Sequence, residues 1–479
     1  MDNKYDVIII GAGISGLVCG CYLAKLGKRV LILEQHSQVG GYCGSFRRGG
    51  FLFDIGVHYL GGLKRNGRLN RLLNDLNIGD EISFVRFDPS DTIIIPNHKV
   101  SFYSDFNKTI EELRKSFPRY KDKILEFYNL MSDKNFYSVY VKFKKKTFKN
   151  VLDAFFDNVE IKTIFSAVLG NVGLPPSKTP AVTALVLFQD FIFNSGYYPR
   201  GGMQLFPDTL LKAFLRFGGE INLKTKVNRI NVGKSGKISG VSIEGAKHIS
   251  SNTVVSCCDV KETVMDFLMG KKISCGMVKK VAKLKPSISS YALYLGVKEG
   301  CVKALKNHGT IWYMPTYDIE GIYNNIFEEK ICKREKYFVA VFPSFHDAML
   351  APAGSASVEL FIGAPFISEK FWNSNRKIME ENLIGRTKEL IPDLSSNIVI
   401  KEDATPFTFY RYTANSKGAL YGAASMSRQI SRSYMPQRTN VANLYLAGHW
   451  TTSSGLGQGG VAGCIYSGQN VAKLVMKND

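Results

Sequence analysis

The sequence predicts an α/β fold built around a doubly wound, Rossmann-type domain, and three observations support this prediction. The chain opens with an apolar, β-branched run at residues 5–10 that leads directly into a glycine-rich turn. It closes with a second glycine-rich stretch at residues 455–460, just before a helix-like segment. Residues 220–230 and 253–256 resemble further strands of the same sheet. Because both ends of the chain contribute, this domain is expected to be discontinuous in the sequence.

The first motif has the layout of a strand, a turn and a helix that bind a dinucleotide. Residues 5–10 form the predicted buried strand, and residues 14–25 form a predicted helix with an apolar face. Between them, Gly11 permits the tight turn, Gly13 lets the backbone approach a pyrophosphate, and Gly16 lets helix and strand pack closely. The helix N-terminus offers free N–H groups and the positive end of the helix dipole. Both features favour phosphate.

The residues after this unit, together with the C-terminal stretch, predict which dinucleotide binds. A second predicted strand, residues 28–33, ends at Glu34, whose carboxylate can hold ribose hydroxyls and would repel a 2′-phosphate. The glycine pair Gly40–Gly41 follows. The GxGxxG at residues 455–460 cannot open another dinucleotide fold, because no further strand and acid follow it. A helix N-terminus aimed at a flavin ring, which gains negative charge on reduction, explains it instead. The predicted cofactor is FAD.

The same layout divides the chain into two domains. We expect the FAD-binding domain to comprise residues 1–91, 196–285 and 433–479, and the substrate domain to comprise residues 92–195 and 286–432. The first substrate segment looks helical and is rich in Phe, Leu, Ile and Val, whereas the second offers strands. A sheet floor with an apolar helical lid would form a tunnel for a long hydrophobic substrate. An ordinary core accounts for the same residues equally well.

Composition narrows the classes of protein that fit. The chain has 479 residues, 45% of them hydrophobic, and no uninterrupted apolar run of about 18 residues that would span a membrane. Its nine cysteines include no CxxC pair and its seven histidines show no metal-ligand spacing, so we expect reduced thiols and no metal site. The first strand begins too early to leave room for a signal peptide. These features predict a cytoplasmic, globular protein.

The formal net charge of +21 is unusually basic. No nucleic-acid-binding motif accompanies it, so we expect no nucleic-acid partner. Residues 137–149 interleave aromatic side chains with lysines, a composition that suits the headgroup region of a bilayer. A solvated edge of the substrate domain explains the same run. Peripheral contact with the cytoplasmic face of a membrane and a plain solvated edge both stay open.

Taken together, the motifs resemble those of the phytoene desaturase, carotenoid isomerase and retinol saturase group of FAD-dependent oxidoreductases. The matching segments, spread over nearly the whole chain in the right order, are residues 11–17, Glu34, Gly40–Gly41, Asp54-x-Gly56-x-His58, Arg200–Met203, Thr405–Tyr412, Gly418–Gly422 and Ala447–Gly463. The resemblance implies a glutathione-reductase-like FAD-binding domain with a mixed β-sheet plus helical substrate domain. One departure is His449, which stands where many members of the group carry an acidic residue.

The motifs and the resemblance together imply a set of FAD contacts and an activity. The implied contacts are Gly11, Gly13, Ile14, Ser15, Gly16, Glu34, Gly40, Gly41, Val227, Gly448, Gln458, Gly459, Gly460 and Val461. The implied reaction exchanges a hydride with a carbon of a polyene, isoprenoid or related lipid, by desaturation, saturation or redox-neutral isomerisation. Two alternatives share the scaffold: an amine-oxidase-like flavoenzyme, and a non-catalytic protein that binds prenyl groups or lipids.

Few residues are candidates for chemistry, as expected where a flavin carries the reaction. His58 is either catalytic or a hydrogen-bonded structural residue. Tyr410 and Arg411 either approach the flavin from the substrate domain or pack the two domains together, with cation–π stacking. No second nucleotide-binding fold is visible, so an electron donor or acceptor would be an external molecule or protein.

Overall fold

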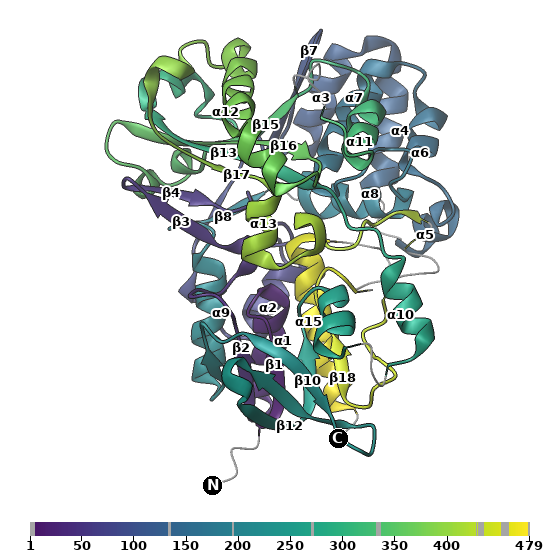
Figure 1. The fold of residues 1–479 in the computed structure, drawn as a ribbon. Helices are drawn as coiled ribbons and strands as arrows, with labels where there is room; N and C mark the ends of the chain where they lie inside the picture. The colour runs from purple at the N-terminus through teal and green to yellow at the C-terminus, as the bar shows by residue number, and fades with distance from the viewer. Residues whose placement is uncertain are drawn as a thin grey trace.

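The computed structural model describes residues 5–132, 136–193, 196–269, 273–331, 337–427, 429, 435–451 and 459–477. Two bodies lie one above the other in Figure 1, and both chain termini lie at the base of the lower body. Each body is built on a seven-stranded sheet. The predicted α/β class, with one Rossmann-type sheet and one mixed sheet covered by helices, is confirmed.

The lower sheet is assembled from the two ends and the middle of the chain. Its centre is β1 (Tyr5–Ile10), which pairs in parallel with β2 (Val30–Leu33) and with β12 (His248–Ser256). The C-terminal strand β18 (Leu444–Leu446) adds to β12 in parallel, and β9 (Glu220–Asn222) adds to β2. Two antiparallel strands complete the order β10-β11-β12-β1-β2-β9: β10 (Val227–Val232) and β11 (Ile238–Ile243). The predicted discontinuity therefore exists in the sheet itself.

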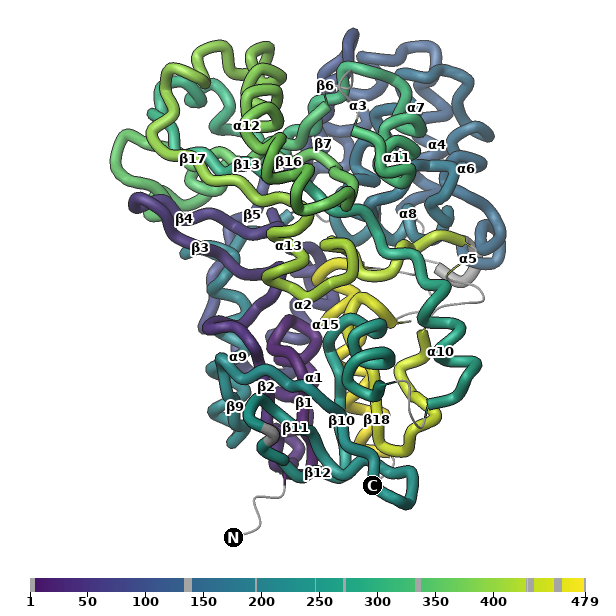
Figure 2. Tube along the Cα trace, in the orientation of Figure 1, coloured from purple at the N-terminus to yellow at the C-terminus, as the bar shows by residue number. Residues whose placement is uncertain are grey.

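The first and last helices lie side by side on this sheet. Figure 2 shows the N-terminal and C-terminal segments, purple and yellow, running together through the lower body. The helix α1 (Ile14–Lys25) is almost entirely buried, and the hydroxyl of Ser15 donates to the carbonyl of Cys464 in α15 (Gly460–Met476) at 2.8 Å. A Cβ at Gly16 would lie 2.0 Å from the carbonyl oxygen of Gly11. Only glycine therefore permits this close packing of helix against turn.

The remaining elements of the lower body surround this core and link it to the upper body. They are α2 (Arg68–Asp75), α9 (Leu205–Arg216), α10 (Cys275–Ala282), the hairpin of β3 (Ser45–Arg48) with β4 (Phe51–Asp54), and the ladder of β5 (Phe84–Arg86) with β8 (Tyr197–Pro199). The backbone N–H of Asp54, at the end of β4, donates to Glu359 of the upper sheet at 2.6 Å. The β3–β4 hairpin therefore joins the two bodies.

The upper sheet has the strand order β17-β13-β16-β15-β14-β6-β7. Its strands are β6 (Asp91–Ile95), β7 (His98–Phe102), β13 (Ser289–Lys298), β14 (Thr310–Tyr313), β15 (Phe338–Val341), β16 (Ser355–Ala364) and β17 (Ile398–Ala404). The segment 92–195, expected to look helical, begins instead with strands. There β6 and β7 form a hairpin, and β6 pairs in parallel with β14. The β-branched run that ends at Ile95, followed by Pro and Asn, is a hairpin pattern.

Helices cover the upper sheet on both sides. The lid consists of α3 (Phe106–Ser116), α4 (Lys121–Ser132), α5 (Phe136–Phe143), α6 (Phe148–Phe155), α7 (Val159–Ala167), α8 (Ala181–Leu187) and α11 (Ile319–Phe327). Figure 1 shows these helices beside β6 and β7, with α12 (Glu369–Arg386) over the other part of the sheet and α13 (Pro406–Thr413) facing the lower body. Within the described ranges, no helix is long and apolar enough to cross a bilayer.

Candidate functional site

The turn between β1 and α1 presents bare backbone at a helix N-terminus. Gly13 caps α1 without any side-chain hydrogen bond, and a Cβ built there would meet no atom within 4 Å. Gly40 donates its N–H to the carbonyl of Ala12 at 2.9 Å, which brings the Gly40–Gly41 pair beside the first turn. Open space next to unpaired helical N–H groups is what a pyrophosphate requires. The first glycine motif therefore fits the phosphates of a dinucleotide.

Glu34 and the start of β10 lie next to this turn. One carboxylate oxygen of Glu34 accepts the N–H of Ala12 at 2.8 Å, and the other accepts the N–H of His36 at 2.9 Å. The N–H of Thr225 donates to the carbonyl of Glu34 at 2.8 Å. This bond brings the chain that leads into Val227, a buried residue, beside the carboxylate. The geometry suits a ribose with its adenine beyond.

The C-terminal motif supplies a second helix N-terminus. Gly448 follows β18 and donates its N–H to the hydroxyl of Ser467 at 2.9 Å. The helix α15 begins after Gly459 without a side-chain cap, and Gly460 and Val461 form its first turn. Gln458 lies outside the described residues. Ser15 of α1 bonds to Cys464 of α15, so the two helix N-termini lie close together, and the residues present fit an extended FAD molecule.

A cavity extends from the first turn of α15 into the upper body. It comprises about 1520 Å³ of space that atoms do not fill, part of it open to solvent. Residues 459–462 at the start of α15 and residues 56–59 after β4 line it from the lower body. The rest of the wall comes from the helical lid, from β13, β14, β15 and β16, and from Phe409, Leu420 and Tyr421. Within the described chain, no Asp, Glu, Lys or Arg lines it. The cavity therefore suits an uncharged, mostly apolar molecule.

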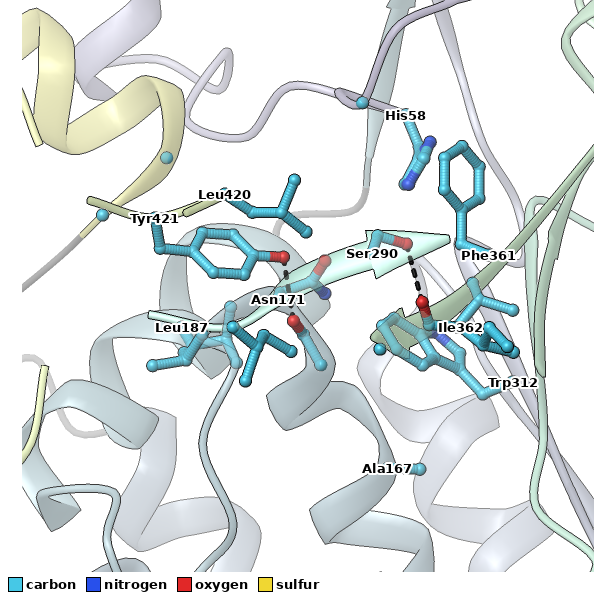
Figure 3. A pocket seen from close by; sticks show the side chains of 18 of the residues that line it. His58, Ala167, Asn171, Leu187, Ser290, Trp312, Phe361, Ile362, Leu420 and Tyr421 are labelled. Atoms are coloured by element: carbon cyan, nitrogen blue, oxygen red, sulfur yellow. Dashed lines mark hydrogen bonds between the residues drawn. The ribbon is translucent and has the colours of Figure 1, made fainter. Parts of the chain in front are cut away.

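The polar side chains in the wall mostly bond to the protein itself, as Figure 3 shows for two of them. The hydroxyl of Tyr421 donates to the carbonyl of Gly170 at 2.8 Å. The hydroxyl of Ser290 donates to the carbonyl of Ile362 at 2.8 Å. The first bond ties the segment that follows α13 to the lid, and the second ties β13 to β16. They also remove the two hydroxyls as donors toward a ligand.

His58 is the candidate reactive residue that the structure places in the cavity wall. Its imidazole lies beside Phe361, with ring centroids 4.4 Å apart, and projects into the cavity in Figure 3. Burial lowers the pKa of His58 to about 4, so the ring is neutral at physiological pH. Its Nδ1 lies 4.0 Å from a carboxyl oxygen of Glu359.

Tyr410 and Arg411 lie outside the cavity, on the outer face of α13. The side chain of Tyr410 is 47% exposed and its ring meets Phe366 edge-on. Arg411 forms an exposed ion pair with Glu369 at 2.8 Å. It is their neighbour Phe409 that lines the cavity. The structure therefore brings His58, but not this pair, to the cavity wall.

Sequence reasoning missed the carboxyl group behind the wall. Glu359 is fully buried in β16, within a run of apolar residues, and its partner Asp54 is fully buried at the end of β4. The sequence did carry a signal for it: an acidic residue stands in the middle of an otherwise apolar strand. Burying a carboxyl group is unfavourable unless it has a hydrogen-bond partner, so such a residue indicates a buried polar contact. The identity of that partner was not readable from the strand alone.

Comparison with known proteins identifies the family. Residues 14–306, more than half of the chain, match the family described as "Flavin containing amine oxidoreductase". The all-trans-retinol 13,14-reductase of Danio rerio is 23% identical over 501 residues, covering 92% of this chain and 82% of the relative. The chloroplastic prolycopene isomerase of Daucus carota is 27% identical over 485 residues, covering 93% of this chain and 76% of the relative.

Solved structures share the fold. An oxidoreductase from Methanosarcina mazei superposes with a TM-score of 0.71 at 18% identity, covering 98% of this chain and all of that one. Putrescine oxidase bound to putrescine superposes with a TM-score of 0.66 at 14% identity, covering 99% of each chain. The predicted cofactor and the predicted enzyme class agree with these findings. The chain belongs to the flavin-containing amine oxidoreductase family and is an FAD-dependent oxidoreductase.

Proposed function

We propose that this enzyme exchanges a hydride with a carbon atom of a hydrophobic polyene, in a saturation, desaturation or cis–trans isomerisation. The observation that carries the proposal is the uncharged cavity that runs from the first turn of α15 into the lid. Relatives named for retinol and for prolycopene, both long conjugated molecules, support it. A polyene carries no charge and matches an apolar wall, since buried apolar surface contributes about 25 cal/mol per Å².

Different elements of the chain would bind different parts of FAD and the substrate. Gly13 and the first turn of α1 would hold the pyrophosphate, Glu34 the ribose, and the first turn of α15 the flavin ring. Bound FAD supplies the hydride chemistry. The apolar wall orients the polyene and keeps water away from the reacting carbon. Aromatic side chains such as Trp312 and Phe361 offer flat surfaces to a conjugated chain.

An amine substrate is the second candidate, because solved oxidases of putrescine and of cyclohexylamine share the fold. A protonated amine in this cavity would meet no carboxylate from the described wall. Burying an unpaired ammonium group is strongly unfavourable. Aromatic side chains of the wall, such as Tyr421, offer only ring faces to such a cation. The polyene is favoured because it leaves no charge uncompensated.

The test is an anaerobic spectrum of the purified flavoprotein with three probes: all-trans-retinol, prolycopene and putrescine. Each probe is added to the oxidised protein and to protein reduced with dithionite, and products are separated by chromatography. Product from a polyene with reduced flavin supports saturation or isomerisation, and product with oxidised flavin supports desaturation. Bleaching of the flavin bands by putrescine alone would replace the polyene with an amine.

The lid carries a surface that we propose touches a cytoplasmic membrane. Tyr140 and Val141 of α5 are 37% and 47% exposed, and the lysines at 144–146 that follow them are exposed. Thr147, at the start of α6, bridges to Pro180 at the start of α8, and α8 lines the cavity. A lipid could pass from such a surface to the cavity over a short path. We also propose an external electron donor or acceptor.

A further inference from the structure

Two buried polar atoms face each other behind the cavity wall without a hydrogen bond to any described residue. They are Nδ1 of His58 and Oε2 of Glu359, 4.0 Å apart. Each unpaired buried polar atom costs about 1–3 kcal/mol. A small rotation of either side chain would bring the two atoms within hydrogen-bond distance. The two side chains can therefore form a hydrogen bond with each other, provided that one of the two facing atoms carries a proton.

Glu359 carries that proton, because its neighbour Asp54 holds the negative charge. The carboxylate of Asp54 accepts from the hydroxyl of Ser45 at 2.6 Å, from the hydroxyl of Tyr198 at 2.5 Å and from the N–H of Met203 at 3.2 Å. Among the described residues, Glu359 accepts a hydrogen bond only from the N–H of Asp54, at 2.6 Å. Burial and the charge of Asp54 raise the pKa of Glu359 well above its usual range, whereas that of Asp54 rises only to about 6.

The charge state of His58 completes the contact. Its pKa is lowered by burial, so the imidazole is neutral and carries one proton. If the Glu359 carboxyl donates its proton to Nδ1, Nδ1 is the acceptor, and the single proton of the imidazole ring is on Nε2. Nε2 has no hydrogen-bond partner within the described ranges and, unlike Nδ1, is not among the buried unpaired atoms. The ring lines the cavity in Figure 3, so Nε2–H is a donor available to a ligand.

We propose that Glu359 is a positioning residue that holds His58 as a neutral Nε2–H donor, and that this donor selects an unsaturated lipid bearing a hydroxyl or carbonyl oxygen over a pure hydrocarbon. The inference rests on the proposed function, which leaves both kinds of polyene open. A hydrocarbon would leave Nε2–H unpaired in an apolar site, whereas an alcohol or aldehyde oxygen would accept from it. One such bond changes affinity by about 10-fold.

The first arm of the test measures the protonation of His58 without any substrate. Flavin-loaded protein labelled with ¹⁵N-histidine is examined by NMR at pH 7.5, and the His58 signals are identified by their loss in His58→Gln. A neutral ring protonated at Nε2 is expected in the wild type. Glu359→Gln should keep this tautomer, because its amide can donate to Nδ1, while Glu359→Leu should show a mixture of the two neutral tautomers. A ring protonated at Nδ1, or a charged ring, in the wild type would overturn the inference.

The second arm measures selectivity with two probes that differ by one oxygen: all-trans-retinol and its deoxygenated hydrocarbon analogue. Dissociation constants come from the perturbation of the flavin spectrum. Wild type and Glu359→Gln should prefer retinol by about 10-fold over the hydrocarbon. His58→Leu should lose that preference, because the donor is gone, and Glu359→Leu should reduce it. Equal affinities in the wild type would contradict the selectivity.

The two arms separate failure of this inference from failure of the proposed function. If neither probe binds, the polyene proposal fails, and the NMR arm still decides whether Glu359 sets the tautomer of His58. If Glu359→Leu does not fold, the tautomer of the wild type and of Glu359→Gln decides the same point.

Discussion

At the scale of single residues, Gly13 offers a clean separation of cofactor binding from folding. Its backbone is extended, with φ −67° and ψ 175°, and a Cβ there meets nothing within 4 Å, so a Cβ fits without displacing its neighbours. A valine side chain there would occupy the space of the pyrophosphate. We expect Gly13→Val to purify folded but without flavin, as judged by circular dichroism and visible absorption.

The matched control is Gly276→Ala, because Gly276 lies in the exposed first turn of α10 and its Cβ also meets nothing. This variant should keep the full flavin content. Full flavin content in Gly13→Val would show that the phosphates bind elsewhere.

His449 predicts a pH dependence of stability. Its Nε2 lies 3.1 Å from Oδ1 of Asn415, which also accepts from Trp450 at 2.6 Å, so His449 is the donor. Burial lowers the pKa of His449 from 6.5 to about 4. Below pH 6.5 His449 binds a proton in the unfolded chain, whereas in the folded protein it stays neutral down to about pH 4. This contribution to stability is complete above pH 6.5 and falls by about 1.4 kcal/mol for each pH unit toward pH 4.

The measurement compares the wild type with His449→Gln, whose amide keeps the donor to Asn415 but cannot ionise. Thermal melts at pH 7.5 and pH 5 should show a larger drop in Tm for the wild type than for the variant. Equal drops would mean that His449 is already protonated, or accessible to solvent, in the folded protein.

At the scale of elements, the turn between α5 and α6 carries the predicted membrane contact. Changing the lysines at 144, 145 and 146 to Glu reverses three exposed charges without touching the core. Each lysine near an anionic surface contributes about 1 kcal/mol, so binding should weaken by about 100-fold or more. Sedimentation with vesicles that contain anionic lipid measures the effect.

The control places the same substitution on the opposite end of the molecule. Lys234, Lys237 and Lys247 are exposed on the turns around β10, β11 and β12, far from the lid in Figure 1. Their replacement by Glu changes net charge equally and should leave vesicle binding nearly unchanged. Equal weakening by the two triple variants would mean that net charge, not this turn, governs binding.

At the scale of the whole molecule, the cavity exists because two bodies meet over it, and its volume should limit the substrate. Ala167, the last residue of α7, is 2% exposed and lines the cavity in Figure 3. Ala167→Phe should leave the flavin content intact and lower kcat/KM for retinol by at least about 10-fold, since overpacking costs 1–3 kcal/mol. Ala167→Val should lie between the wild type and Ala167→Phe. Unchanged turnover in the Phe variant would place the substrate elsewhere.

Much of the lower body was predictable from sequence because its signals are local. The turn at Gly11 and Gly16, and the acid at Glu34, depend on the geometry of a single strand–turn–helix unit. The pairing of the C-terminal strand with the N-terminal sheet was also predictable. The second glycine motif has no strand after it, so it can bind a dinucleotide only as part of a sheet that the rest of the chain has formed. The hairpin of β6 and β7 was missed, since its place in the upper sheet depends on pairing with β14.

The sequence by itself determined the Rossmann-type unit, the FAD cofactor and the discontinuity of the sheet, since each follows from short-range backbone requirements. The tertiary structure alone decided which polar groups meet in the substrate site. Asp54 and Glu359 are 305 residues apart, and Glu359 approaches both Asp54 and His58 only where the β3–β4 hairpin packs on the upper sheet. The protonation states of these groups follow from burial and proximity, which are properties of the packed molecule and not of any one segment.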